Sequence, residues 1–94
     1  MSSTSTADRL TDAMADLAAE IEAGNVYQWH TQRLYVEDRY GDRRIVPHQI
    51  TYAMRQRHAL STEYLHESDA WRRVRLSPSG QEAYDRWLVE HDRR

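Results

Sequence analysis

All permanently charged basic side chains of this 94-residue sequence are arginines, thirteen in number, and lysine is absent. Three of them, Arg72, Arg73 and Arg75, follow Trp71 within one short stretch. A guanidinium group presents a planar fork of N–H donors that matches the oxygens of a phosphate group and the edge of a guanine base. The residue types therefore favour the recognition of an anion.

Charge is unevenly distributed along the chain, although the formal net charge is only -2. Residues 1–24 contain five acidic residues and one Arg, a net charge of -4, whereas residues 43–75 contain seven Arg and three acidic residues, a net charge of +4. A polyanion responds to the local potential more than to the net charge of a protein. This asymmetry indicates a polyanionic partner for the second half of the chain.

Length and composition restrict the class of protein. Ninety-four residues suit one domain, so we expect a flexible tail over residues 1–5 and a single domain over residues 6–94. The absence of cysteine excludes disulfides, thiolate catalysis and zinc sites built on sulfur. The first residues lack the pattern of a signal peptide, and no apolar run is long enough to span a membrane. These features favour a cytoplasmic protein.

Catalytic and metal-binding patterns are not evident. No two histidines lie three or four residues apart, the helical spacing of metal ligands; they are His30, His48, His58, His66 and His91. The sequence also has no glycine-rich phosphate loop and no Gly-x-Ser-x-Gly motif. We therefore expect neither enzymatic activity nor a cofactor.

The first helix has the most regular pattern. Its apolar side chains are spaced four, three and four residues apart, at Leu10, Met14, Leu17 and Ile21. Ser5 or Thr6 is predicted to cap its start, and Gly24 stands where a helix-ending glycine is expected.

The segment that follows has two interpretations. Residues 26–29 are aromatic and β-branched, which suits a short strand or the lead-in to a helix. Thr31 could cap a helix that runs to about Tyr40, and this is the favoured interpretation. Alternatively, residues 34–39 pair with residues 43–46 as a hairpin, because leucine, valine and isoleucine there also suit strands.

A further helix is predicted over about residues 47–59, with Pro47 at its first position, where a missing N–H costs nothing. Its buried side would carry Ile50, Ala53 and Met54. The remaining side chains are rich in hydrogen-bonding groups and would face outward: His48, Gln49, Thr51 or Tyr52, Arg55 and Gln56.

The last third of the chain predicts a hairpin and a helix. Residues 60–67 and 71–76 would be antiparallel strands, with Val74 buried on one face and Arg73 on the other because side chains alternate along a strand. Ser77 then caps a terminal helix whose first residue is Pro78.

The resulting order is helix, short strand, helix, helix, two-stranded hairpin and helix, a mainly α-helical α+β arrangement. It resembles the winged helix-turn-helix fold, and its second half is similar to transcriptional regulators of the PadR and MarR type. In these families a recognition helix precedes a hairpin wing with a basic second strand, which closes with a Leu-Thr-Pro-x-Gly-like segment. The matching segments are Ile50 to Leu60, Glu63 to Arg75, and Leu76-Ser-Pro-Ser-Gly80, within residues 47–88. The segment from Gly41 to Val46 is longer than the turn usual between the two helices of the motif.

The resemblance implies a small transcriptional regulator that binds double-stranded DNA sequence-specifically, with a recognition helix at about 47–59 and a wing at about 62–76. The side chains expected to contact DNA are Arg43, Arg44, Gln49, Tyr52, Arg55, Gln56, Arg72 and Arg73. Trp71 and Arg75 have structural explanations. Trp71 can pack on a neighbouring strand, and Arg75 can pair with Glu63 or with another cross-strand carboxylate.

Terminal helices form the dimer in the same families, which implies a homodimer. The expected interface residues are Leu10, Met14, Leu17, Ile21, Tyr84, Trp87 and Leu88. A monomer could instead bury the apolar side chains of both terminal helices in its own core.

A second function remains open, namely a protein-interaction or accessory module of phage or plasmid type that does not bind DNA on its own. Its contact surface would be the acidic first helix.

Overall fold

The computed structural model describes residues 9–30, 32–64 and 70–92. Within these residues the chain has an α+β fold, and no helix is long and apolar enough to cross a membrane. Three helices and five strands follow one another in the order α1 (Asp12–Glu22), β1 (Val26–Gln28), β2 (Leu34–Glu37), β3 (Arg43–Ile45), α2 (His48–Gln56), β4 (Leu60–Tyr64), β5 (Arg72–Leu76) and α3 (Pro78–Glu90).

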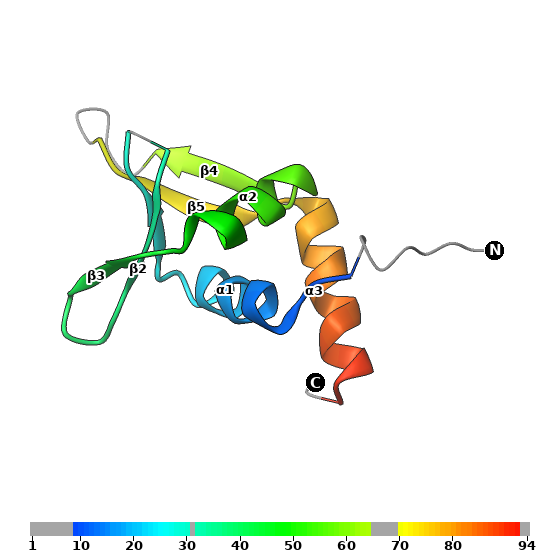
Figure 1. The fold of residues 1–94 in the computed structure, drawn as a ribbon. Coiled ribbons are helices and arrows are strands. Elements are labelled where there is room, and N and C mark those ends of the chain that lie inside the picture. Colours follow the sequence, from blue (N-terminus) through cyan, green and yellow to red (C-terminus); the bar gives the residue numbers. More distant parts are fainter. Residues whose placement is uncertain (1–8, 31, 65–69, 93–94) are drawn as a thin grey trace.

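The strands form one antiparallel sheet in the order β3-β2-β1-β5-β4. β1 lies in the middle, where Tyr27 is opposite Tyr35 of β2 on one side and opposite Arg73 of β5 on the other. α1 contacts β5 and both other helices, and all three helices lie on one side of the sheet in Figure 1. The other face of the sheet carries no helix among the described residues.

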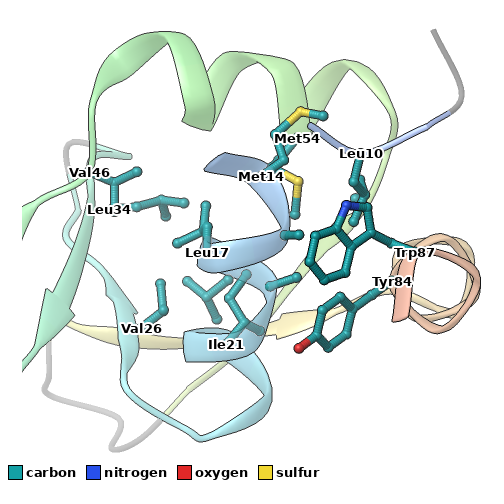
Figure 2. Packing of buried hydrophobic residues seen from close by; sticks show 14 of the residues in the cluster. Leu10, Met14, Leu17, Ile21, Val26, Leu34, Val46, Met54, Tyr84 and Trp87 are labelled. Atoms are coloured by element: carbon teal, nitrogen blue, oxygen red, sulfur yellow. The ribbon is translucent and has the colours of Figure 1, made fainter. Parts of the chain in front are cut away.

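The core lies between this sheet and the helices. Val26 and Val74 at the centre of the sheet are fully buried, as are Ile21 of α1 and Met54 of α2. Removing such side chains from water is the main favourable contribution to folding of a domain this small. Figure 2 shows how the sheet, α1, α2 and α3 all contribute to one cluster.

The seven residues expected at a dimer interface all belong to this core. None of their side chains is more than 9% exposed, and they are Leu10, Met14, Leu17, Ile21, Tyr84, Trp87 and Leu88. In Figure 2 the rings of Tyr84 and Trp87 reach from α3 toward the apolar side of α1. Packing within one chain therefore accounts for both apolar stripes, which corrects the assignment of these side chains to an interface.

α1 starts later than predicted. Thr11 is its N-cap, and the Thr11 hydroxyl oxygen accepts a hydrogen bond from the Met14 N–H at 3.2 Å. The predicted caps Ser5 and Thr6 lie outside the described residues, and residues 9–11 are not helical. The capping hydroxyl of Thr11 explains the later start, because it satisfies an N–H group that has no partner within the helix.

The end of α1 confirms the prediction for Gly24, which has a φ of 84°. Its N–H donates to the Ile21 carbonyl, and the next N–H, of Asn25, donates to the Glu20 carbonyl, both at 3.0 Å. This pair of bonds requires a left-handed residue after the helix, a conformation that glycine adopts without strain.

The predicted helix over residues 31–40 is wrong, and the alternative hairpin is present. The hairpin consists of β2, a turn and β3. The predicted cap Thr31 lies outside the described residues. A carboxylate oxygen of Asp38 accepts hydrogen bonds from the Tyr40 and Asp42 N–H groups at 2.8 and 3.0 Å, and Gly41 follows with a φ of 83°. These bonds stabilise a turn where a helix would have to continue.

The β4–β5 hairpin confirms the second predicted strand pair, with Leu60 opposite Leu76 and Thr62 opposite Val74. β4 ends at Tyr64, and the predicted strand residues 65–67 lie outside the described residues. The predicted alternation holds, because Val74 is buried between the two neighbouring strands.

The start of α3 is hydrogen-bonded to the segment between α2 and β4. Ser77 is the N-cap as predicted, and Pro78 begins the helix. The Ser77 hydroxyl accepts from the Gly80 N–H at 3.1 Å and donates to the His58 carbonyl at 2.6 Å. The Ser77 N–H donates to the Ala59 carbonyl at 2.8 Å. These bonds hold the first turn of α3 against the backbone that enters β4.

Gly80→Ala is expected to destabilise the protein, although alanine is the better helix former. A Cβ at Gly80 would lie 2.2 Å from the Ala59 carbonyl oxygen, and backbone cannot move aside as a side chain can. Overpacking of this kind costs about 2 kcal/mol, which exceeds the gain of about 1 kcal/mol in helix propensity. Urea denaturation measures the difference.

Val89→Ala is the matched control in the same helix, because Val89 is 70% exposed. Its free energy of unfolding should stay within about 0.5 kcal/mol of the unchanged protein. A Gly80→Ala variant as stable as this control would show that the close approach to Ala59 does not constrain the fold.

Candidate nucleic-acid interface

α2 presents a polar face to solvent. Gln49, Tyr52 and Gln56 are exposed as predicted, and Tyr52 is 50% exposed despite its large aromatic ring. The alternative outward residue, Thr51, is buried. The ring of His48 lies 6.2 Å from that of Tyr52 at an interplanar angle of 20°, so the two rings cover the first turn of this face.

This face is free of acidic side chains, since the chain has no Asp or Glu between Arg43 and Thr62. Pro47 precedes α2 without a side-chain hydrogen bond to the first turn. The N-terminus of a helix carries a partial positive charge and N–H groups without helical partners. Both features favour an anion near this end of α2.

Arg55 lies at the edge of the same face and connects α2 to the β1–β2 turn. Its Nη2 donates to the Gln28 side-chain oxygen at 3.0 Å and to the Gln32 carbonyl at 2.5 Å. Gln32 has a φ of 70°, so its carbonyl is held in a turn conformation. Arg55 thus positions the helix as well as contributing a charge.

Arg72 lies on the side of the sheet that faces the helices. Directly opposite residues of an antiparallel pair point to the same face, and Arg72 is opposite Gln28. Gln28 in turn accepts the hydrogen bond from Arg55. Arg55 and Arg72 therefore flank one glutamine at the margin of the α2 face.

Arg43 and Arg73 lie on the opposite face of the sheet. Arg73 is opposite Tyr27, and the guanidinium carbon of Arg43 lies 4.5 Å from the centre of the Tyr27 ring and 4.3 Å from that of Trp71. Arg43 Nε is also 3.0 Å from a carboxylate oxygen of Glu37. The alternation of side chains along each strand thus separates these two arginines from α2.

Aromatic rings surround Arg43 on that opposite face. The Trp71 ring centre lies 4.4 Å from the ring centre of Trp29 and 5.3 Å from that of Tyr35. Trp71 therefore packs on the neighbouring strands, in agreement with its structural interpretation. The strand register places Arg75 opposite Ser61 and Glu63 opposite Arg73.

Arg44 lies beside α1. It is opposite Val36 on the helical side of the sheet and lines a groove whose other rim carries Asp16 and Glu20. These acidic neighbours distinguish the surroundings of Arg44 from the α2 face, which has no acidic side chain.

The eight expected DNA-contacting residues are thus divided among four places. Gln49, Tyr52 and Gln56 share the exposed face of α2, and Arg55 and Arg72 lie at its margin. The other three lie elsewhere: Arg44 beside α1, and Arg43 and Arg73 on the opposite face of the sheet.

Arg33 is a residue that sequence reasoning missed. It is exposed in the β1–β2 turn and lines a pocket with His48 and Arg55 of α2. No spacing in the sequence relates this turn to α2, because Arg33 and Arg55 are brought together by the hydrogen bonds of Arg55 across the fold.

Among the described residues, no three His, Asp or Glu side chains gather as they would around a metal ion. Comparison of the chain with protein-family models, with curated proteins and with solved structures gives no match.

Proposed function

We propose that this chain binds double-stranded DNA through the exposed face of α2, as a winged-helix type of transcriptional regulator. The resemblance implies the order helix, short strand, helix, helix, two-stranded hairpin and helix. When one of the two consecutive helices is left out, this order matches α1, β1, α2, β4, β5, α3, which supports the proposal. The β2–β3 hairpin stands in the place of that helix. β4 and β5 would then be the wing.

The observation that carries the proposal is the carboxylate-free face of α2. Gln49 and Gln56 are seven residues apart, which places them two turns apart on one side of the helix, with Tyr52 between them. The major groove of DNA admits a helix, and a glutamine amide can bind the edge of an adenine with two hydrogen bonds. A tyrosine hydroxyl commonly contacts phosphate oxygens.

The cations at the margin of α2 suit the DNA backbone. Arg33, Arg55 and Arg72 lie near this face, whereas Arg43 and Arg73 point to the other side of the sheet. With three phosphate contacts per chain, the logarithm of the binding constant should fall with the logarithm of salt concentration with a slope of about -3. A backbone contribution of this kind is independent of sequence, so the glutamines would provide base selection.

Replacing both Gln49 and Tyr52 with alanine should weaken duplex binding by at least about tenfold, the factor expected for the loss of one or two good hydrogen bonds. Both side chains are exposed, so the melting temperature should change little. Fluorescence anisotropy with a pool of random-sequence duplexes at low salt measures the affinity.

Tyr40→Ala is the control, because Tyr40 is a tyrosine that is 79% exposed in the turn of the β2–β3 hairpin. Its affinity for the duplex pool should equal that of the unchanged protein. Equal affinities for the Gln49, Tyr52 double variant and for this control would contradict the role of α2.

A second candidate function rests on the groove beside α1. Apolar side chains that include Leu17 and Ile50 line it, and Asp16 and Glu20 form an acidic rim. α1 carries four acidic residues and no basic residue. Charge complementarity favours a basic, partly apolar segment of a partner protein as the occupant.

A gel shift at low salt separates the two functions. Electrostatic binding to random duplex is expected of a DNA-binding domain even without its specific site. No shift at tens of micromolar protein would favour the interaction module over DNA binding.

A further inference from the structure

A pocket lies between the β1–β2 turn and α2, and we call it the turn pocket. Its volume is about 560 Å³, within the range of sites that hold small organic ligands. Its lining combines polar residues, Arg33, His48, Thr51 and Arg55, with apolar residues, of which Ile45 is 52% exposed whereas Leu34 and Val46 are buried. The pocket therefore offers two different surfaces to one ligand.

The polar part of the lining is cationic. Arg33 and Arg55 contribute two permanent positive charges, and no residue that lines the turn pocket is acidic. Arg55 uses Nη2 to bind the turn, which fixes the position of its guanidinium group at the pocket. Two arginines without a carboxylate between them favour an anion as the ligand.

Thr51 provides a second, independent indication of a ligand. This residue lines the turn pocket and is only 4% exposed, and its hydroxyl oxygen has no hydrogen-bond partner among the described residues. A buried hydroxyl without a partner is costly, so most such groups in proteins are paired. Less than 1 Å² of the hydroxyl oxygen is accessible, so an acceptor oxygen of a bound ligand would satisfy it after a rotation of the Thr51 side chain.

The first turn of α2 borders the same pocket through His48. α2 has nine residues, and Pro47 before it makes no side-chain capping bond. The positive end of the helix therefore adds to the field of the two arginines.

We propose that the turn pocket binds a phosphate group carried on an organic molecule. Arg33 and Arg55 supply the charged donors, Thr51 donates its hydroxyl hydrogen to a phosphate oxygen, and Ile45 lies beside the organic part. The phosphate can belong to the backbone of a DNA duplex or to a free phosphorylated metabolite, and the chemistry of recognition is the same. With a backbone phosphate as the ligand, the site rests on the proposed function, which assigns Arg33 and Arg55 to the DNA backbone, whereas binding of a free phosphorylated molecule goes beyond it.

Titration with inorganic phosphate and with deoxyribose 5-phosphate tests the site. At constant ionic strength, each probe should shift the backbone amide signals of Arg33, His48 and Thr51 in a saturable way, observed by nuclear magnetic resonance. The sugar phosphate should bind more tightly than inorganic phosphate because it also buries apolar surface of Ile45, which lines the pocket and is 52% exposed. Shifts that do not saturate, or that spread over the whole protein, would overturn the proposal.

Arg33→Gln should weaken sugar phosphate binding by about tenfold, the factor expected for one charged hydrogen bond, while leaving the melting temperature unchanged because Arg33 is exposed. Arg39→Gln is the matched control, since Arg39 is also exposed but lies in the turn at the far end of the β2–β3 hairpin. The same loss of affinity in both variants would mean that only the net charge matters, and it would overturn the site.

Duplex DNA distinguishes the two sources of the phosphate. If Arg33→Gln weakens binding of the random duplex pool as well as of the sugar phosphate, the turn pocket holds a backbone phosphate. If it weakens only the sugar phosphate, the ligand is a free phosphorylated molecule. Sugar phosphate binding without any duplex binding would contradict the proposed function and support the pocket, and duplex binding without sugar phosphate binding would do the reverse.

Thr51→Val removes the hydroxyl with little change of shape, and both residues are β-branched. Because the hydroxyl has no partner within the described chain, the variant should be at least as stable as the unchanged protein and should bind the sugar phosphate several-fold more weakly. Thermal denaturation and the same titration measure the two effects. Reduced stability with unchanged affinity would show that the hydroxyl serves the fold and would overturn its role at the pocket.

Discussion

The pairing of β1 with β5 in the middle of the sheet is the constraint on which the rest of the structure depends. Val26 and Val74 are buried there, so one face of these strands is committed to the core beneath the helices. Alternation then sends Tyr27 and Arg73 to the opposite face. A shift of the register by one residue would exchange the two sets, and burial of the valines prevents it. The same pairing therefore determines both the core and the placement of the charged side chains.

Arg55 links this sheet to the candidate interface. Its hydrogen bonds to Gln28 and Gln32 bring α2 against the β1–β2 turn, and Arg33 in that turn then lies at the same pocket. The charged margin of α2 is thus built from a helix, a turn and a central strand. Arg43 has a different role, because it packs between the rings of Tyr27 and Trp71 on the face that the helices do not cover. The number of arginines in the sequence is therefore a poor guide to how many of them can contact one partner.

Sequence patterns predicted elements whose signals are contained within a few residues. The end of α1 at Gly24 and the start of α3 at Ser77 depend on hydrogen bonds between near neighbours, and both predictions are confirmed. Residues 31–46 were ambiguous because leucine, valine and tyrosine at this spacing suit a helix or a strand. Antiparallel pairing of β2 with the central strand β1 favours the hairpin, and that partner lies outside the local pattern.

The sequence by itself determined the end of α1, the start of α3, the alternation of the β4–β5 hairpin and the acid-free composition of α2. Only the tertiary structure decided that the stripes of α1 and α3 pack within one chain, that Arg43 and Arg73 lie opposite α2, and that Arg33 meets Arg55. The physical reason is the range of the interactions. Caps and alternation are properties of consecutive residues, whereas strand neighbours and helix packing join segments far apart in the chain, and their choice depends on which apolar surfaces can be buried together.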